Sequence, residues 1–184
     1  MKVAEAAKAV GKGKVLICPT DTVYGLVCDT TNKKAVEKLF RIKNRKLTKP
    51  LPIFVKDVKM AKKLAHIDQK QEKVLKKVWP GKVTAVLKRK KGYKLYGVGK
   101  KTIALRIPKY KLVIELLKKT NSPLTGTSAN VSEKPASTKI KEVLKQFTGK
   151  KYQPDLVIDK GNLPKSRPSK VVDLTGKTIK ILRK

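Results

Sequence analysis

The stretch Pro19–Leu26 reads PTDTVYGL, and it directly follows the short aliphatic run Val15–Cys18. A partly β-branched, aliphatic run of this length predicts a buried strand. Because proline has no N–H to donate to a sheet ladder, the strand is expected to end at Pro19. Two hydroxyls and a carboxylate follow within three positions, and polar groups at the end of a buried strand favour a ligand site in an α/β protein. The alternative is an ordinary Pro-Thr-Asp turn.

A helix is predicted to begin at Lys33, with Thr31-Asn32 as its cap. An apolar stripe runs along one face of this helix through Val36, Leu39 and Phe40. Lys43 continues that stripe at the C-terminal end, so its ammonium group is expected to point inward or along a cleft. Arg45 follows just beyond the helix, and the two cations suit a ligand that carries several negative charges. The alternative for Lys43 is a simple complement to the helix dipole.

Two later stretches also place polar side chains next to strands. The run Lys101–Ile107 alternates, which predicts a strand with Arg106 near its end and over a cleft; a half-exposed surface arginine is the alternative. The run Pro123–Asn130, PLTGTSAN, leads from a short strand into a loop of small residues, where backbone can approach a ligand closely. Ser128 and Asn130 add hydrogen-bonding groups there, although a plain turn explains Ser-Ala-Asn equally well.

The rest of the chain interleaves helices with strands, which is typical of an α/β fold. Further helices are expected over 58–64 and 69–78, with Asp57 and Asp68 as their caps. Others are expected over 3–10 and 112–117, and from about 140 after a cap at Ser137-Thr138. Further strands are expected over 50–55, 82–87, 156–158 and 179–182, and in a segment ending at 172. Neither a repeat nor a linker interrupts the pattern, so we expect a single domain over residues 1–184.

Length and composition limit the kinds of segment and site that this chain can contain. The 184 residues, 40% of them hydrophobic, are enough to bury a core. No apolar run approaches the ~20 residues of a membrane span, and Met1–Val10 lacks a secretory apolar segment, so a cytoplasmic location without membrane contact is expected. Cys18 and Cys28 are too few for a disulfide framework. Since His66 is the only histidine, the chain lacks ligands for a zinc site, and we predict no metal-ligating residues.

The net charge is strongly positive. Forty-seven lysines and arginines against 13 acidic residues give +34 at pH 7. Such a surplus attracts nucleic acid through counterion release, so non-specific affinity for RNA is expected. Aromatic residues are only 5% of the chain, which disfavours recognition by base stacking. A lysine-rich proteome, unrelated to RNA, is the alternative.

Four strings in order resemble the YrdC/TsaC family of threonylcarbamoyl-AMP synthases. They are Pro19–Leu26, Lys43-Asn44-Arg45 followed by Pro50-Leu51, Thr127–Asn130, and Val171–Leu174. The similarity extends from near the N-terminus to about Leu182. It implies a YrdC-like fold, a twisted, open, mixed sheet with flanking helices around a basic cavity.

The resemblance also implies a reaction. L-Threonine, bicarbonate (or CO₂) and ATP would give threonylcarbamoyl-AMP and pyrophosphate, with Mg²⁺ accompanying ATP, for threonylcarbamoyladenosine modification of tRNA. A downstream threonylcarbamoyl-transferase complex would take the product, and the basic surface would contact tRNA or another structured RNA.

By the same resemblance, the site residues form three groups. The catalytic group is Lys43, Arg45, Ser128 and Asn130. The ATP-binding group is Lys43, Arg45, Arg106, Ser128, Asn130, Ser169 and Arg183. The threonine-binding group is Thr20, Thr22, Tyr24 and Arg45. Asp21 is the only acid in a place that suggests magnesium.

The sequence departs from the family pattern at three places. Lys170 follows Ser169 where the family has threonine, which puts that threonine's nucleotide contact in question: either Lys170 replaces it with a charge or Lys170 faces away. Lys46 stands where proline is usual, and the glycine expected shortly after Arg183 is missing.

Two other functions are compatible with the sequence. One is a non-catalytic module of the same fold that binds double-stranded RNA or tRNA or acts in ribosome maturation, which the charge and Lys170 favour. The other is a related carbamoyl-adenylate enzyme with another substrate, as in hydrogenase maturation, although such domains usually sit in much longer chains. The intact PTDTVYGL, K-x-R and S-x-N strings favour the synthase, because RNA binding alone does not need them.

Overall fold

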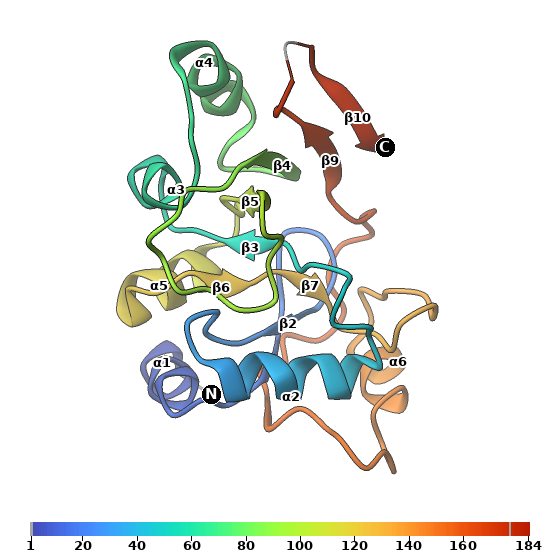
Figure 1. The fold of residues 1–184 in the computed structure, drawn as a ribbon. Helices are drawn as coiled ribbons and strands as arrows, with labels where there is room; N and C mark the ends of the chain where they lie inside the picture. The colour runs from blue at the N-terminus through green and yellow to red at the C-terminus, as the bar shows by residue number, and fades with distance from the viewer. Residues whose placement is uncertain (1, 177) are drawn as a thin grey trace.

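The computed structural model describes residues 2–176 and 178–184, which form two mixed β-sheets with helices around them (Figure 1). The four-stranded sheet has the order β7-β2-β1-β8, with β1 at Leu16–Cys18, β2 at Gly25–Val27, β7 at Thr127–Ser128 and β8 at Leu156–Val157. The six-stranded sheet has the order β10-β9-β4-β5-β3-β6, with β3 at Ile53–Phe54, β4 at Val83–Lys88, β5 at Thr102–Arg106, β6 at Leu124–Thr125, β9 at Lys170–Asp173 and β10 at Lys180–Arg183. Pairs β1·β8, β3·β5 and β4·β9 are parallel and the others antiparallel, which confirms the predicted mixed α/β architecture.

The helices lie around both sheets (Figure 1). They are α1 at Val3–Gly11, α2 at Lys33–Lys43, α3 at Val58–Leu64, α4 at Gln69–Val78, α5 at Lys111–Thr120 and α6 at Ile140–Lys145. Within the described ranges, none of them is long and apolar enough to cross a membrane.

Strand β1 lies between two hydrophobic cores. Leu16 and Cys18 belong to a core that includes residues of α1 and α5. Ile17 belongs to the other core, which includes residues of α2, α3 and α6. Because successive residues of a strand point to opposite faces of the sheet, a strand covered on both sides is apolar throughout. This explains the uninterrupted apolar run and confirms the predicted strand, with Pro19 directly after its end.

Local caps set the ends of several helices. The Asn32 side chain accepts a hydrogen bond from the Ala35 N–H at the start of α2, as predicted. Asp57 and Asp68 cap α3 and α4 in the same way. The predicted cap for α6 was wrong: Lys139 occupies that position without a side-chain cap. Ser137 instead accepts from the Lys139 N–H and donates to Glu142, so its hydroxyl closes a turn before the helix.

The C-terminus of α2 decides where Lys43 and Arg45 lie. Asn44 has the left-handed φ of 49°, and the Arg45 N–H donates to the Phe40 carbonyl while the Asn44 N–H donates to that of Arg41. This pair of bonds is the Schellman motif, which ends a helix in one residue. Lys43 therefore stays on the buried face of the last turn, while the chain leaves the helix axis at Arg45.

Candidate functional site

A cavity of about 580 Å³ opens between the β1–β2 loop, the end of α2, strand β7 and the ends of β5 and β10. All of the site residues predicted from the sequence line it: Thr20, Thr22, Tyr24, Lys43, Arg45, Arg106, Ser128, Asn130, Ser169 and Arg183. The register Gly25↔Ser128 between β2 and β7 joins two of the quoted motifs directly. A cavity of this size suits a ligand as large as a nucleotide.

Lys43 connects α2 to the S-x-N string. Its Nζ atom donates to the Ser128 carbonyl at 2.7 Å, to the Asn130 carbonyl at 3.0 Å and to Asn130 Oδ1 at 2.8 Å. The Ser128 hydroxyl donates to the same Oδ1 at 2.6 Å. An ammonium group has three N–H donors, and all three are engaged here. The predicted inward orientation of Lys43 is thus confirmed, and its first partners are protein groups rather than open solvent.

Burial changes the acidity of this lysine. Lys43 is only 3% exposed, and burial together with the nearby Arg45 charge lowers its pKa from 10.5 to about 7. Both effects disfavour the ammonium form, because it is poorly solvated and repelled by a like charge. The protonation state of Lys43 in the free protein therefore changes close to neutral pH.

We expect this titration to appear in the stability of the protein. Relative to a Lys43→Met variant, the wild type should gain free energy of unfolding as the pH rises from 7 towards 10.5. In that window the unfolded state keeps the lysine proton and the folded state releases it, so the unfolded state binds more protons. The gain is at most about 4 kcal/mol, since a pKa difference of one corresponds to about 1.4 kcal/mol. Urea unfolding of both proteins at several pH values measures it; a difference that is constant across the window would contradict the lowered pKa.

Arg45 is held by the loop that follows it. Its Nε donates to the Lys49 carbonyl and its Nη2 to the Pro50 carbonyl, both at 3.0 Å, and burial lowers its pKa. The same loop brings Lys46 and Lys49 to the cavity wall, although the sequence interpretation did not assign them a site role. In the sequence, the only indication of a site role for Lys46 and Lys49 was their position close to the K-x-R string.

The β1–β2 loop is closed by its own hydroxyls. Thr20 Oγ1 accepts from the Thr22 N–H at 3.1 Å, donates to the Val23 carbonyl at 2.7 Å and lies 3.0 Å from Thr22 Oγ1. Both threonines are buried in the wall of the cavity. Tyr24 also lines the cavity, but its hydroxyl donates to the Gly161 carbonyl and accepts from the Lys160 N–H. That hydroxyl is therefore anchored to the 160–161 loop.

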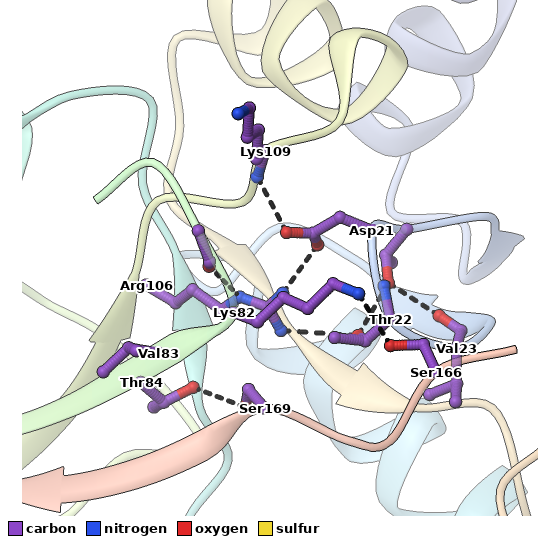
Figure 2. Close-up of polar contacts among 12 residues, drawn as sticks. Asp21, Thr22, Val23, Lys82, Val83, Thr84, Arg106, Lys109, Ser166 and Ser169 are labelled. Atoms are coloured by element: carbon purple, nitrogen blue, oxygen red, sulfur yellow. Dashed lines mark hydrogen bonds and ion pairs between the residues drawn. The ribbon is translucent and has the colours of Figure 1, made fainter. Parts of the chain in front are cut away.

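Arg106, at the end of β5, points toward this loop (Figure 2). Its Nη2 donates to Asp21 Oδ1 at 2.6 Å, and its Nη1 lies 3.4 Å from Thr22 Oγ1. Arg106 is 3% exposed, so it is not a surface arginine, and the predicted orientation toward a cleft is confirmed. The second carboxylate oxygen of Asp21 accepts from the Lys109 N–H at 2.9 Å.

Ser169 and Arg183 meet where β9 begins and β10 ends. Arg183 donates from Nε and Nη2 to the Ser169 carbonyl, at 2.9 and 2.6 Å, and the Ser169 hydroxyl lies 2.9 Å from Thr84 Oγ1. Lys170 is exposed on β9 and does not line the cavity. Of the two possibilities left open for Lys170, the structure favours the one in which it faces away.

Basic side chains outnumber acidic ones in the cavity wall. Among the lining residues of the described ranges, Glu133 is the one acidic side chain. The six basic side chains are Lys43, Arg45, Lys46, Lys49, Arg106 and Arg183. Glu133 has a left-handed φ of 71°, unusual for a residue other than glycine. In residues 2–176 and 178–184, no three His, Cys, Asp or Glu side chains come together as a metal site. The arrangement suits an anionic ligand with several charges.

A close approach of backbone and ring shapes one side of the cavity. A Cβ atom on Gly126 would lie 2.8 Å from the Phe54 ring, closer than side chains tolerate. Gly126 and Phe54 both line the cavity. The small residues of the 123–130 run therefore serve packing as well as access, which the sequence pattern alone did not separate.

Comparison with known proteins finds a matching family and several relatives. The family model for Sua5, YciO and YrdC proteins, described as telomere recombination, matches residues 8–184. A Methanocaldococcus jannaschii protein provisionally named threonylcarbamoyl-AMP synthase is 38% identical over 167 residues, 91% of this chain and 77% of that protein. The Pyrococcus abyssi threonylcarbamoyl-AMP synthase is 32% identical over 176 residues, 95% of this chain. This chain spans only 51% of the length of the P. abyssi protein.

The fold agrees with the sequence comparison. The crystal structure of P. abyssi Sua5 complexed with L-threonine superposes with a TM-score of 0.89 and 32% identity, covering 98% of this chain and 53% of that one. The superposition thus extends over nearly the whole chain. Because the family model covers nearly the whole chain and a solved relative shares its fold, the chain belongs to the Sua5/YciO/YrdC family.

Proposed function

We propose that this chain is a threonylcarbamoyl-AMP synthase, a nucleotidyltransferase that uses L-threonine, bicarbonate and ATP. The observation that carries the proposal is the convergence of PTDTVYGL, K-x-R and S-x-N on one cavity with six basic side chains. The names of the relatives and the threonine bound to the P. abyssi protein support it.

The reaction needs positioning and charge stabilisation more than a nucleophilic side chain. The amine of threonine combines with CO₂ and loses a proton to give a carbamate. A carbamate oxygen then attacks the α-phosphorus of ATP, and the bond to the β-phosphate oxygen breaks to release pyrophosphate. Charge grows on the leaving pyrophosphate, so fixed cations and hydrogen-bond donors along its path lower the barrier. Lys43, Arg45, Lys46 and Lys49 are the cations that we assign to the phosphates, and Thr20, Thr22 and Tyr24 are assigned to threonine.

Magnesium would enter with the nucleotide. Mg²⁺ is usually held by one or two carboxylates together with substrate phosphates, and it neutralises phosphate charge during transfer. Asp21 has both carboxylate oxygens engaged within the protein, so we do not assign it as a ligand. Glu133 is the carboxylate in the cavity wall that would hold the ion.

Pyrophosphate release by the purified protein tests the proposed function. The assay contains ATP and magnesium, and it compares the complete mixture with mixtures that lack threonine or bicarbonate. Release that requires both co-substrates is expected. Release independent of threonine, or none under any condition, would contradict the proposal. We also propose that residues 1–184 form a single domain and that the protein is cytoplasmic.

The second candidate function is RNA binding, which the net charge of +34 favours. We expect affinity for tRNA to fall steeply with salt, because each neutralised phosphate releases a counterion. The slope of log K against log salt should correspond to several ion pairs, and sequence-unrelated RNA should bind similarly. Filter binding between 50 and 300 mM salt, about the range over which such contacts weaken, measures it. A flat salt response would exclude a direct electrostatic role; salt-sensitive binding without pyrophosphate release would favour a non-catalytic module. In the synthase proposal, by contrast, the product is passed to a threonylcarbamoyl-transferase complex.

A further inference from the structure

We propose that Asp21 is a positioning residue that holds the Arg106 guanidinium in its ligand-facing orientation. The inference rests on the proposed synthase function, because Arg106 is one of the residues assigned to ATP in that cavity. Arg106 lines the cavity, whereas Asp21 lies behind it and is absent from the lining residues of the described ranges.

The Asp21 carboxylate is fully committed to this arrangement (Figure 2). Its Oδ1 accepts from Arg106 Nη2 at 2.6 Å, and its Oδ2 accepts from the Lys109 N–H at 2.9 Å. Lys109 lies just beyond the strand that carries Arg106, so one carboxylate holds both the side chain and the backbone that follows it. The paired side chains are 4% and 7% exposed, so this is a buried ion pair. Removing either partner of such a pair leaves the other charge buried and uncompensated, which strongly destabilises the folded protein.

Other contacts fix the plane of the guanidinium. Arg106 Nε donates to the Gly81 carbonyl at 2.9 Å, and its Cζ lies 5.7 Å from the centre of the Phe54 ring. An arginine carries five N–H donors in a rigid fork. The contacts to Asp21 and Gly81 use two of them, and a third points toward Thr22 Oγ1 at 3.4 Å. The remaining donors belong to a side chain that lines the cavity, so the fork is held from behind and open in front.

The charges explain why a carboxylate is needed behind this arginine. Burial and the nearby Arg183 charge lower the pKa of Arg106, whereas Asp21 raises it. Without Asp21 the guanidinium would be a buried cation among other cations, and repulsion would favour its withdrawal from the wall. Asp21 therefore keeps Arg106 in place while the cavity holds no anionic ligand.

A double-mutant cycle tests whether Asp21 acts through Arg106. The variants are Asp21→Asn, Arg106→Met and the double variant, each assayed for kcat and KM with ATP and with threonine, and for ATP affinity by calorimetry. Asp21→Asn should lower kcat/KM about 10- to 100-fold, an effect of the size known for removing the hydrogen-bond partner behind a metal-ligating residue. In the Arg106→Met background the same change should have an effect of less than about twofold, since its target is gone. Ser166→Ala is the matched control: it removes the Lys82–Ser166 hydrogen bond in the same region, outside the cavity wall, and should leave kcat/KM unchanged.

The outcomes separate this inference from the proposed function. If the losses of Asp21→Asn and Arg106→Met multiply in the double variant, Asp21 acts independently of Arg106 and the inference is wrong. If the wild type shows no threonine-dependent turnover, the synthase proposal fails, and the cycle is read from ATP affinity alone with the same criterion. Thermal unfolding of all four proteins identifies a folding defect: each single variant leaves an unpaired buried group, so the double variant should lose less stability than the sum of both.

Discussion

Alanine in place of Lys43 is expected to reduce pyrophosphate release by about 10³-fold or more. The ammonium group makes three contacts with Ser128 and Asn130, so its removal releases the S-x-N string from α2 as well as deleting a cation from the wall. Loss of a single preorganised donor at a reacting group typically costs about 10²–10³ in turnover. Here one substitution removes a charge and the anchor of two neighbouring site residues. Steady-state pyrophosphate release with all co-substrates measures the effect.

Two further variants separate charge from geometry. Lys43→Arg keeps the charge, but a planar guanidinium does not match three acceptors arranged around an ammonium, so it should restore little turnover. Lys34→Ala removes an exposed lysine from the same helix and should have no effect. If Lys43→Ala retained more than about a tenth of the wild-type turnover while folded, the assignment of Lys43 to this reaction would be wrong.

Local signals predicted most helices and several strands correctly. The Asn32 cap, the apolar stripe from Val36 and the end of the pattern at Lys43 define α2 without tertiary information. The same holds for Asp57 and Asp68, whose carboxylates start α3 and α4. Each of these signals lies within one turn of the structure it determines, which is why a single sequence suffices.

Strands β2 and β7 were not predicted as strands. Gly25–Val27 and Thr127–Ser128 are too short for a periodic pattern, and both lie inside motifs that were interpreted as loops. They become strands because β2 pairs with β1 on one side and with β7, far along the chain, on the other. The site residues could be named from the resemblance, but their mutual contacts could not. The contact between Lys43 and Asn130 depends on the pairing of β2 with β7. The contact between Arg106 and Asp21 depends on where β5 ends.

The two lysines of the 45–50 loop illustrate the same limit. Lys46 appeared only as a departure from the family pattern, and Lys49 had no role. In the structure Arg45 bonds back to the Lys49 and Pro50 carbonyls, which curls the loop so that both lysines reach the cavity wall. A side chain that folds a loop onto its own backbone leaves no periodic signature in the sequence.

Asn130→Ala should lower both stability and turnover, because the Asn130 side chain is the centre of the S-x-N network. Its Oδ1 accepts from Lys43 Nζ and from the Ser128 hydroxyl, and its Nδ2 donates to the carbonyls of Val131 and Lys134. The residue is 7% exposed, so the groups it leaves behind have limited access to water. We expect a loss of about 2–4 kcal/mol in the free energy of unfolding, because several buried groups lose a partner at once. Chemical denaturation measures that loss, and turnover is assayed well below the unfolding midpoint.

Asn130→Asp distinguishes the two sides of this network. The carboxylate keeps acceptors for Lys43 and Ser128, and a negative charge beside Lys43 should raise the pKa of that lysine above its present value of about 7. The other oxygen, however, faces the Val131 and Lys134 carbonyls, which need a donor. If the Lys43 contact dominates, the aspartate variant should be more active than the alanine variant, and the pH at which Lys43 loses its proton should rise. If the backbone contacts dominate, both variants should lose turnover equally, because without those donors the 131–134 loop no longer holds Asn130 and Glu133 against the cavity. An unchanged turnover in both variants would show that the network serves folding alone.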